Sequence, residues 1–418
     1  MTRFARTRAP AIALLASVLL SACATDYVAR TSGVRRAYER YDHSRAISEL
    51  DTRVEEEQRR LDEGRHPDTL LFLLDRGMIL HAAGNYDESN AVLHEAERVA
   101  SSLDIVSVSE EATTLATTQR RRAYRGEDFE LLLINVFKAL NYAALGDREA
   151  ALVEVRRVNH RLRLMAADRE EPHEQLAIAR YMGGVLWESA GKLDSAFIDY
   201  SHALERTGDL DHLVEPLLRL AARTGRSDVH ASLLERYPNV PHEPLGPKEG
   251  QVVVVISAGL SPEKKATVHE SEVDLLAVPY YQRRRWSRTR AAVRVGDESR
   301  QTVTVTSVEQ VAVKHLERRI ARMLGRSMAG AAMKAGLATG VGALTKSEDL
   351  GYLTFYLLMH TNRPDLRSWL SLPAEMQVAR MRLPAGEHVV EVGWEGHTTR
   401  HPVVIRPGEI TVLPLRRY

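Results

Sequence analysis

The sequence has almost no cysteine: Cys23 is the only one among 418 residues. A single thiol excludes a disulfide within the chain and any metal site built from several cysteines. Aromatic residues are also few, at 6%, whereas hydrophobic residues reach 44% and charged residues 27%. This composition is typical of a globular chain. Its core must therefore be held by packing without covalent cross-links.

The hydrophobic run near the start, Ala9–Leu20, is short and is interrupted by Pro10. A helix needs about twenty apolar residues to cross a bilayer, so this run is too short to be a lasting transmembrane segment. Basic residues and no acid precede it, namely Arg3, Arg6 and Arg8. A basic start, a short apolar run and then small residues are typical of an export signal.

The residues directly before Cys23 are Leu20, Ser21 and Ala22. Together with the cysteine they resemble the lipobox of bacterial lipoproteins. The resemblance implies a signal peptide at 1–22, cleavage before Cys23, and acylation of its sulfur and its new amino group by lipid such as palmitate. Two or more acyl chains anchor a protein stably. We therefore expect 23–32 to be a lipid-anchored tether, and the residue after the cysteine, an alanine, favours the outer membrane with the protein facing the periplasm.

Charge and motifs point away from several activities. The chain has 57 basic and 56 acidic residues, and the resulting net charge of +1 argues neither for nor against a polyanionic partner. No zinc-protease or hydrolase-elbow motif is present, and the sixteen histidines are scattered. A near match to a phosphate-binding loop at 340–347 has Thr345 where a glycine is needed. We predict no catalytic residue, no metal, no cofactor, no nucleotide and no nucleic acid.

Residues 33–237 show helical periodicity, with apolar residues at i, i+3 and i+4 and short turns. Glycines recur at the turns between paired amphipathic segments, and Gly191 and Gly225 are separated by 34 residues. This period and the small and aromatic residues around it resemble tetratricopeptide (TPR) repeats. The residues that carry the resemblance and are expected to pack the hairpins are Gly77, Gly84, Tyr86, Ala96, Tyr142, Gly146, Ala151, Gly184, Gly191, Ala196, Tyr200 and Ala203. Such arrays stack to form a concave groove that holds a peptide or protein.

Four prolines within 238–250 indicate a linker and a domain boundary. The remainder, 251–418, alternates like β-structure. We expect strands at 251–257, 273–280, 290–295, 302–307, 376–383, 388–394, 401–405 and 410–415. A helical insertion is expected at about 308–361, with helices at 308–344 and 349–360. The predicted fold class is α+β multidomain, with an N-terminal TPR-like α-solenoid followed by a β-sandwich-like domain. The Pro-Gly turns of the tail resemble the PEGA-type β-sandwich repeats of bacterial surface proteins.

Two further segments stand out. The first is basic with interleaved aromatics and is a candidate anion patch, or else a solvated loop between strands, formed by Arg283, Arg284, Arg285, Trp286 and Arg288. The second, 327–344, is rich in Ala and Gly, which allows close helix packing, self-association or contact with a membrane. Lys334 in its middle argues against a membrane-spanning role.

Motifs at 124–130, 139–147 and 368–375 resemble an uncharacterised proteobacterial family of TPR-containing lipoproteins, which implies a domain plan and no activity. Our leading hypothesis is a non-enzymatic adaptor or scaffold that binds envelope proteins through its array. A sharper hypothesis of the same class, resting on fold-level analogy, is regulation of cell-wall synthesis. Two alternatives stay open. One is an envelope hydrolase acting on peptidoglycan or polysaccharide through dispersed carboxylates, such as Glu110-Glu111 or Glu170-Glu171. The other is a subunit of a secretion or export assembly.

Overall fold

A computed structural model describes residues 27–58, 67–110, 123–167, 176–207, 211–266, 279–320 and 365–418. The chain divides into two compact units, residues 1–63 and 64–418. The predicted boundary at 238–250 lies within the second unit. The signal peptide, the lipobox and Cys23 lie outside the described residues, as do the proposed helices at 327–344 and 349–360.

The described residues of the first unit form the helices α2 (Tyr27–Arg30), α3 (Ser32–Glu39) and α4 (His43–Gln58). Helices α3 and α4 form an antiparallel pair whose core includes Val34, Tyr38 and Leu50. We expected a tether up to residue 32, but residues 27–30 are helical, and Tyr27 is only 2% exposed. This part of the segment is therefore folded, because its aromatic and aliphatic side chains are buried.

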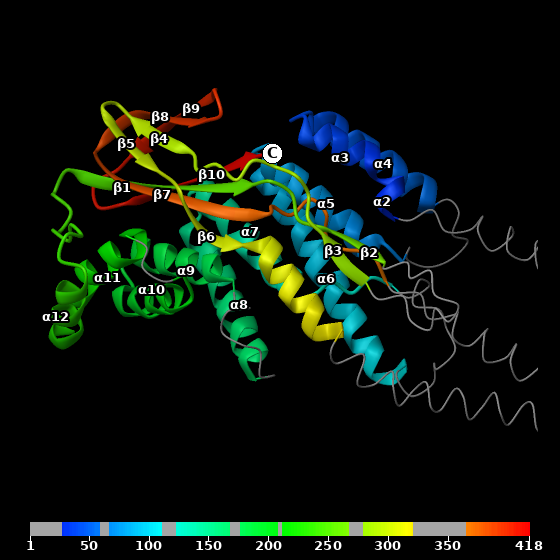
Figure 1. The fold of residues 1–418 in the computed structure, drawn as a ribbon, viewed down its shortest axis with the longest axis horizontal. Coiled ribbons are helices and arrows are strands. Elements are labelled where there is room, and N and C mark those ends of the chain that lie inside the picture. Colours follow the sequence, from blue (N-terminus) through cyan, green and yellow to red (C-terminus); the bar gives the residue numbers. More distant parts are fainter. Residues whose placement is uncertain are drawn as a thin grey trace, which may run out of the picture. The chain divides into compact units, whose positions relative to one another are not determined.

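The second unit begins with four helical hairpins that form a TPR-like solenoid (Figure 1). The first helices of the hairpins are α5 (Thr69–Ala82), α7 (Asp128–Leu145), α9 (Ala177–Ser189) and α11 (Asp211–Arg223). The second helices are α6 (Tyr86–Glu110), α8 (Arg148–Ala167), α10 (Leu193–Thr207) and α12 (Ser227–Arg236). Helix α7 starts with a capping box between Glu127 and Glu130 and ends at Gly146, whose φ of 79° favours glycine.

Two four-stranded sheets follow the proline-rich segment. The central sheet has the order β10-β1-β7-β6, with β1 (Glu249–Ala258) parallel to β10 (Ile410–Arg417) and antiparallel to β7 (Glu375–Pro384). Strand β6 (Val303–Ser307) pairs with β7 across a bulge at Thr304/Thr306. The outer sheet has the antiparallel order β5-β4-β8-β9, from β4 (Ala292–Val295), β5 (Glu298–Gln301), β8 (Gly386–Trp394) and β9 (His397–Ile405).

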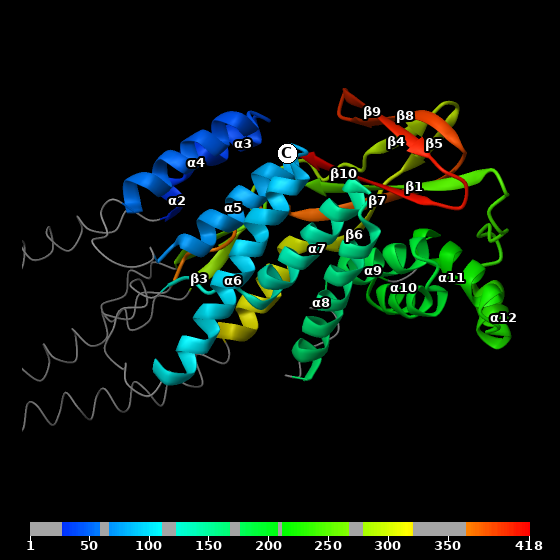
Figure 2. The same ribbon diagram turned by 180° about the vertical axis from the view of Figure 1, so that it is seen from behind.

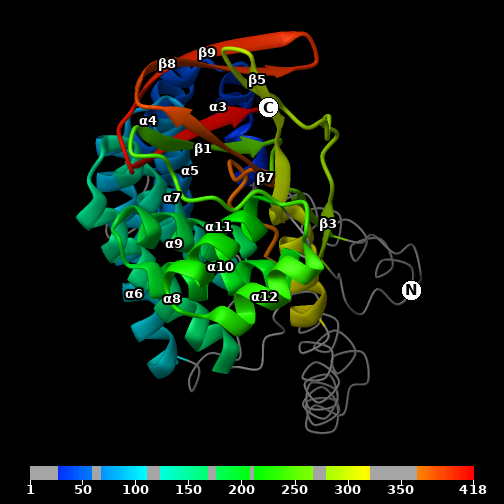
Figure 3. The same ribbon diagram turned by 90° about the vertical axis from the view of Figure 1, so that its left-hand side faces the viewer.

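The two sheets pack face to face around one hydrophobic core. Its members come from alternate positions of β1, β4, β7, β8 and β9 and include Val254, Val293, Met381, Val392 and Ile405. The second unit is thus layered, and Figures 1 and 3 show the central sheet between the outer sheet and helices α7, α9 and α11. The α+β multidomain fold predicted from the sequence is confirmed, with a β-sandwich after the array.

The strand predictions were wrong in detail at two places. The sequence analysis missed β2 (Glu263–Ala266) and the short β5, because their sequences, EKKA and ESRQ, lack an alternation of apolar and polar residues. Strand β2 pairs with β3 (Pro279–Gln282). Of the strand predicted at 273–280, residues 273–278 lie outside the described residues. The helix expected from 308 begins there and is described to residue 320.

Candidate functional site: the two faces of the array and a cavity beside them

The inner face of the array, formed by its first helices, is covered by the central sheet. Arg380 on β7 is the centre of this contact, and its guanidinium donates to Glu188 Oε2 at 2.8 Å and to the Tyr200 hydroxyl at 2.8 Å. It also bonds the Gln251 side chain on β1. Arg219 of α11 donates to the other Glu188 oxygen at 2.5 Å. Both oxygens of one buried carboxylate are therefore paired with guanidinium groups from the helices and from the sheet.

Opposite charges that are buried together stabilise this cluster. Burial alone would raise the pKa of Glu188, but Arg380 and Arg219 outweigh it and hold the pKa at about 2. Beside it, Arg382 of β7 donates to Glu215 of α11 at 2.5 Å. Removing one partner of a buried pair leaves an uncompensated charge. Buried ion pairs therefore stabilise the contact between the sheet and the array in addition to apolar packing.

A second buried cluster lies at the start of α7. The Glu127 carboxylate accepts from Lys264 of β2 at 2.5 Å and from Arg319 at 2.8 Å. Burial opposes ionisation, yet these cations hold the pKa of Glu127 well below its usual range. Burial raises the pKa of the neighbouring Glu130, which accepts from the backbone N–H of Trp369 at 2.8 Å. These two carboxylates are buried and occupied by the chain itself, so they do not form an open acid pair.

The segment before β7 completes the cover. Arg367 donates to Asp68 at 2.8 Å, and Ser371 donates to Asp75 of α5 at 2.6 Å. The fully buried Trp369 ring lies edge-on to Phe137 of α7, with 6.3 Å between ring centroids. Residues from 129 to 141 of α7 are consequently all buried. The groove in which we expected a partner to bind is filled by the protein's own β-structure.

The residues selected for the TPR resemblance lie within the hairpins, where helices approach closely. A Cβ on Gly184 would lie 2.6 Å from the Tyr200 ring, and one on Gly77 would lie 2.5 Å from Leu93. The hairpin-turn glycines, Gly84, Gly146 and Gly191, have positive φ. The buried members are Gly77, Gly184, Ala96, Ala151, Ala196, Tyr200 and Ala203. Tyr142 is half-buried at 3.3 Å from His94, and Tyr86 is half-buried at the α5–α6 turn.

The outer face of the array is formed by α6, α8 and α10 (Figure 2). Polar clusters lie between these helices. Between α6 and α8, the buried Lys138 ammonium lies 3.0 Å from Glu97 and 3.0 Å from Glu154. Between α8 and α10, Asp199 of α10 accepts from Asn159 of α8 at 3.1 Å and from Arg180 of α9 at 2.7 Å. Burial raises the pKa of Glu97, but Asn135 and Lys138 outweigh it and lower the value. The same inter-helix position is thus filled by an ionic cluster in two successive hairpins.

Helix α8 carries an exposed stripe that the fold leaves uncovered among the described residues. Val153 is 42% and Leu164 54% exposed, and they lie on one face of the helix with Arg156, His160 and Arg163. Arg156 stacks over Trp187 at 5.5 Å, which holds its guanidinium at the surface. From Arg156 to Ala167 the helix contains no acid. The α8 stripe therefore combines positive charge with two exposed aliphatic side chains.

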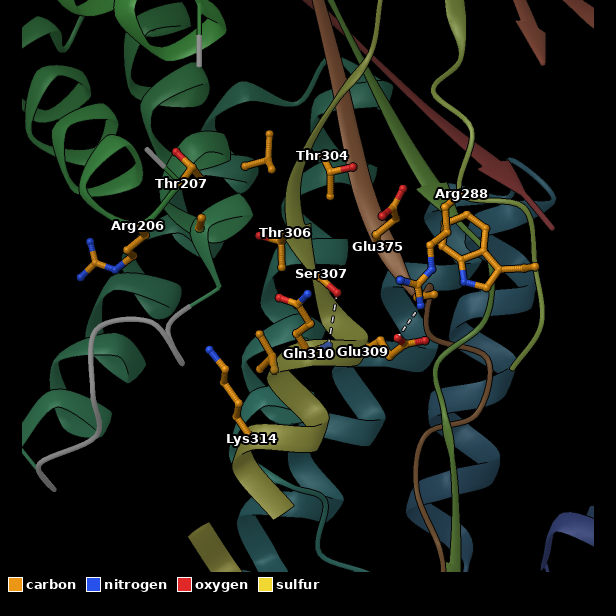
Figure 4. Close-up of a pocket in the computed structure, with 15 residues that line it drawn as sticks. Arg206, Thr207, Arg288, Thr304, Thr306, Ser307, Glu309, Gln310, Lys314 and Glu375 are labelled. Carbon is orange, nitrogen blue, oxygen red and sulfur yellow. Dashed lines mark hydrogen bonds and ion pairs between the residues drawn. The ribbon is translucent and has the colours of Figure 1, made fainter. Parts of the chain in front are cut away.

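A cavity of about 390 Å³ lies where the array meets the central sheet and the helix that begins at Val308 (Figure 4). Its charged lining residues are Arg206, Arg288, Glu309, Lys314 and Glu375. Its uncharged polar lining residues are Thr207, Thr304, Thr306, Ser307 and Gln310. Ser307 caps the helix by accepting from the Gln310 N–H at 3.2 Å, and the Glu309 N–H donates to Ala374. The helix start is thus satisfied internally.

The structure separates the residues of the predicted anion patch. Arg283 and Arg288 both reach one oxygen of Glu309, at 3.1 and 2.8 Å, so the two arginines share one acidic partner. Trp286 packs against the core between the sheets and lines the cavity. Arg285 is exposed and Arg284 is half-buried. The segment contributes one wall of the cavity and two ion pairs, and its arginines do not all gather in one cluster.

Within the described ranges, no group of three or more His, Cys, Asp or Glu side chains is placed to hold a metal ion. No helix in these ranges is long and apolar enough to cross a bilayer.

Sequence comparisons with family models and with curated proteins find no match. Among solved structures, the chain is similar to MamA of AMB-1, with 13% identity, a TM-score of 0.31, and coverage of 50% of this chain and 88% of that one. It is similar to the apo form of RapI, with 12% identity, a TM-score of 0.38, and coverage of 54% and 57%. It is also similar to a Podosopora anserina protein described as a kinesin light chain with nearly identical TPR-like repeats, with 16% identity, a TM-score of 0.34, and coverage of 50% and 92%.

Proposed function

We propose that the chain is a non-enzymatic scaffold that recruits a protein partner on the outer face of its helical array. The observation that carries this proposal is the contrast between a filled inner face and the open α8 stripe. Arg380, Trp369 and their neighbours use the inner face for the protein's own sheet. The α8 stripe keeps exposed aliphatic groups beside basic side chains that form no ion pair with the described residues.

The partner that fits this stripe has an acidic surface with an apolar centre. Opposite charge increases the rate of encounter and sets orientation, and the apolar contact supplies burial. Arg163 at the exposed end of the stripe makes no ion pair in the described structure and is available for such a contact. Val153 and Leu164 lie about three turns apart, which matches a helix or strand lying along α8.

The experiment is capture of partners from envelope extract by the lipid-free protein. We expect a stoichiometric partner that is lost from the double variant Arg163→Glu and Leu164→Ala. The matched control is Arg223→Glu on α11, also at an exposed arginine, which should bind like the unaltered protein. Equal capture of the partner by both variants would show that the α8 stripe is not the binding surface. Failure to capture any stoichiometric partner would contradict the scaffold function.

We further propose that Cys23 is acylated and anchors the scaffold to the periplasmic leaflet of the outer membrane. Support comes from the lipobox sequence and the short apolar run before it. Mass spectrometry of the mature chain should find two or more acyl chains at Cys23, and fractionation should place the protein in the outer membrane. An unmodified thiol would contradict this location without bearing on the α8 contact.

The envelope-biogenesis role, including regulation of cell-wall synthesis, rests on this location and on the resemblance to lipoprotein and PEGA-type sequences. It predicts that the purified protein changes the rate of peptidoglycan synthesis by its partner. Turnover of peptidoglycan by the pure protein would favour the hydrolase alternative. A ring or large oligomer in mild detergent would favour the export-assembly alternative.

A further inference from the structure

The cavity of Figure 4 lies along one edge of the central sheet. Strand β6 comes last in the order β10-β1-β7-β6, so its second edge is paired with no strand among the described residues. The cavity is lined by the consecutive residues 304–307 of this strand. Consecutive side chains of a strand point to opposite faces. A cavity that contacts all four residues therefore lies beside the edge of β6, and Figure 4 shows Arg206 and Thr207 on one side of 304–307 and Arg288 on the other.

The array lies next to this edge, but the hydrogen bond between them does not use the backbone of β6. The backbone N–H of Ile178, in the first turn of α9, donates to the Thr306 hydroxyl at 2.8 Å. A side chain of β6 makes this contact, and the backbone edge stays available. An edge strand presents unpaired N–H and C=O groups that can pair with another chain. Extended peptides bind in this way, by adding a strand to the edge of a sheet.

Two residues that line the cavity carry a buried polar atom without a hydrogen-bond partner among the described residues. The atoms are Oε2 of Glu309, whose side chain is 3% exposed, and the indole nitrogen of Trp286. The first can accept a hydrogen bond and the second can donate one. A peptide backbone carries both complementary groups, since each residue except proline has one N–H and one C=O. The free edge of β6 and these two atoms therefore match the same ligand chemistry.

The lining and the size of the cavity agree with a short strand. Apolar and hydroxyl-bearing side chains both line it, including Ala177, Val305, Val311 and Thr304. The side chains of a bound strand alternate between two directions, so a segment of alternating apolar and hydroxyl residues matches this mixture. At about 3.3 Å per residue, such a segment would pair with 304–307 over roughly four residues. The volume of about 390 Å³ lies within the range of about 300–1,000 Å³ for ligand sites.

We propose that this cavity binds an extended peptide segment of a partner protein, which adds to the free edge of β6 as a further strand of the central sheet. Main-chain hydrogen bonds to β6 would supply most of the recognition, and Glu309 Oε2 and the Trp286 N–H would bind peptide groups beside the edge. The site goes beyond the proposed scaffold function, because it is separate from the α8 stripe and recognises a backbone, whereas the stripe presents charged and aliphatic side chains.

The test is calorimetric titration of the full chain in mild detergent with a hexapeptide of alternating serine and valine whose ends are blocked. Two further peptides carry N-methyl groups, one on every serine and the other on every valine. The N–H groups of successive residues in a strand point to opposite edges, so each set of methyl groups blocks one edge. We expect the unmodified peptide to bind, one methylated peptide to bind at least tenfold more weakly, and the other to stay within threefold of the unmodified peptide.

Hydrogen exchange and a matched pair of variants locate the bound peptide. Saturating peptide should slow exchange of the backbone amides in 304–307 at least fivefold and leave β5, an edge strand of the outer sheet, unchanged. Trp286→Phe keeps an aromatic ring and loses the N–H, and it should weaken binding at least threefold. The control Trp394→Phe, at another tryptophan that packs against the core between the sheets but does not line the cavity, should bind like the unaltered protein.

Several outcomes would overturn the site. Equal binding of all three peptides would show that the backbone is not recognised, and equal weakening by both sets of methyl groups would show that the peptide does not bind as a strand. Tighter binding of maltose than of the peptide would assign the cavity to saccharides. Absence of peptide binding, or unchanged exchange in 304–307, would remove β6 as a docking edge. These results would leave the α8 contact untouched, because its variants do not alter this edge.

Discussion

The inner and outer faces of the helical array are built from the same hairpins but are used differently. On the inner face, charged groups such as Glu188 are buried and paired with residues of the sheet far along the chain. Toward the outer face, Glu97 of α6 and Glu154 of α8 are paired with the buried Lys138 within the array, and the α8 stripe stays exposed. The hairpin pattern thus determines how neighbouring helices pack. Which face is left for a partner is determined by the non-repeating chain that follows.

The strongest test of this comparison removes the central contact of the inner face. Arg380→Met should lower the free energy of unfolding by about 3–5 kcal/mol, because Glu188 and Gln251 lose their partner in a buried setting. Urea unfolding measures the change. The control Arg400→Met, at an arginine that is 75% exposed and paired with Glu391, should cost less than about 1 kcal/mol. Equal costs would show that the sheet does not depend on this contact.

An added methyl group should destabilise the protein more between the packed helices of a hairpin than at an open hairpin turn. Gly184→Ala places a methyl group 2.6 Å from the Tyr200 ring, and this overpacking should cost about 1–3 kcal/mol. Because Tyr200 also bonds Arg380, the change should weaken the inner contact. Thermal unfolding compares it with Gly191→Ala, which has open space and should cost about 1 kcal/mol from its positive φ. A larger loss at Gly191 would contradict the assigned packing.

On acidification, the protein should lose stability through protonation of His81 at a higher pH than through protonation of Glu188. Burial lowers the pKa of His81 to about 4, whereas in the unfolded chain the pKa keeps its ordinary value of 6.5. The unfolded chain binds the proton first, so stability is constant above pH 6.5 and falls as the pH drops from 6.5 to 4. Between pH 7 and 5 the loss should be about 2 kcal/mol. His81→Gln should remove this dependence, whereas His160→Gln, on the exposed stripe, should keep it.

The smallest change in stability is expected on the outer face. The Arg163→Glu and Leu164→Ala double variant should alter the free energy of unfolding by about 0.5 kcal/mol or less, since the removed groups are exposed. Chemical unfolding of this variant, beside its loss of partner capture, would separate binding from folding. A loss above about 2 kcal/mol would show that the α8 stripe is part of the core.

Local patterns in the sequence were sufficient for the hairpins and most of the strands. The turn glycines and the alternation in 251–257 report periodicities that depend only on neighbouring residues. The filling of the inner face could not be predicted in this way, because Glu188 and Arg380 are 192 residues apart. One signal was available: Arg380 and Arg382 alternate with apolar Ala379 and Met381, which indicates a strand with a charged second face. The cavity had no sequence signal, since five separate segments line it.

The parallel pairing of β1 with β10 has a consequence for the order of folding. Gln251 lies opposite Ile410, so the central sheet is complete only when segments about 160 residues apart have met. Helical hairpins form from local contacts and fold early, whereas such distant pairing is slow. We therefore expect a folding intermediate in which the array has formed and the inner face, which the central sheet later buries, is still exposed to solvent. During that time the molecule would be most vulnerable to aggregation and most in need of a chaperone.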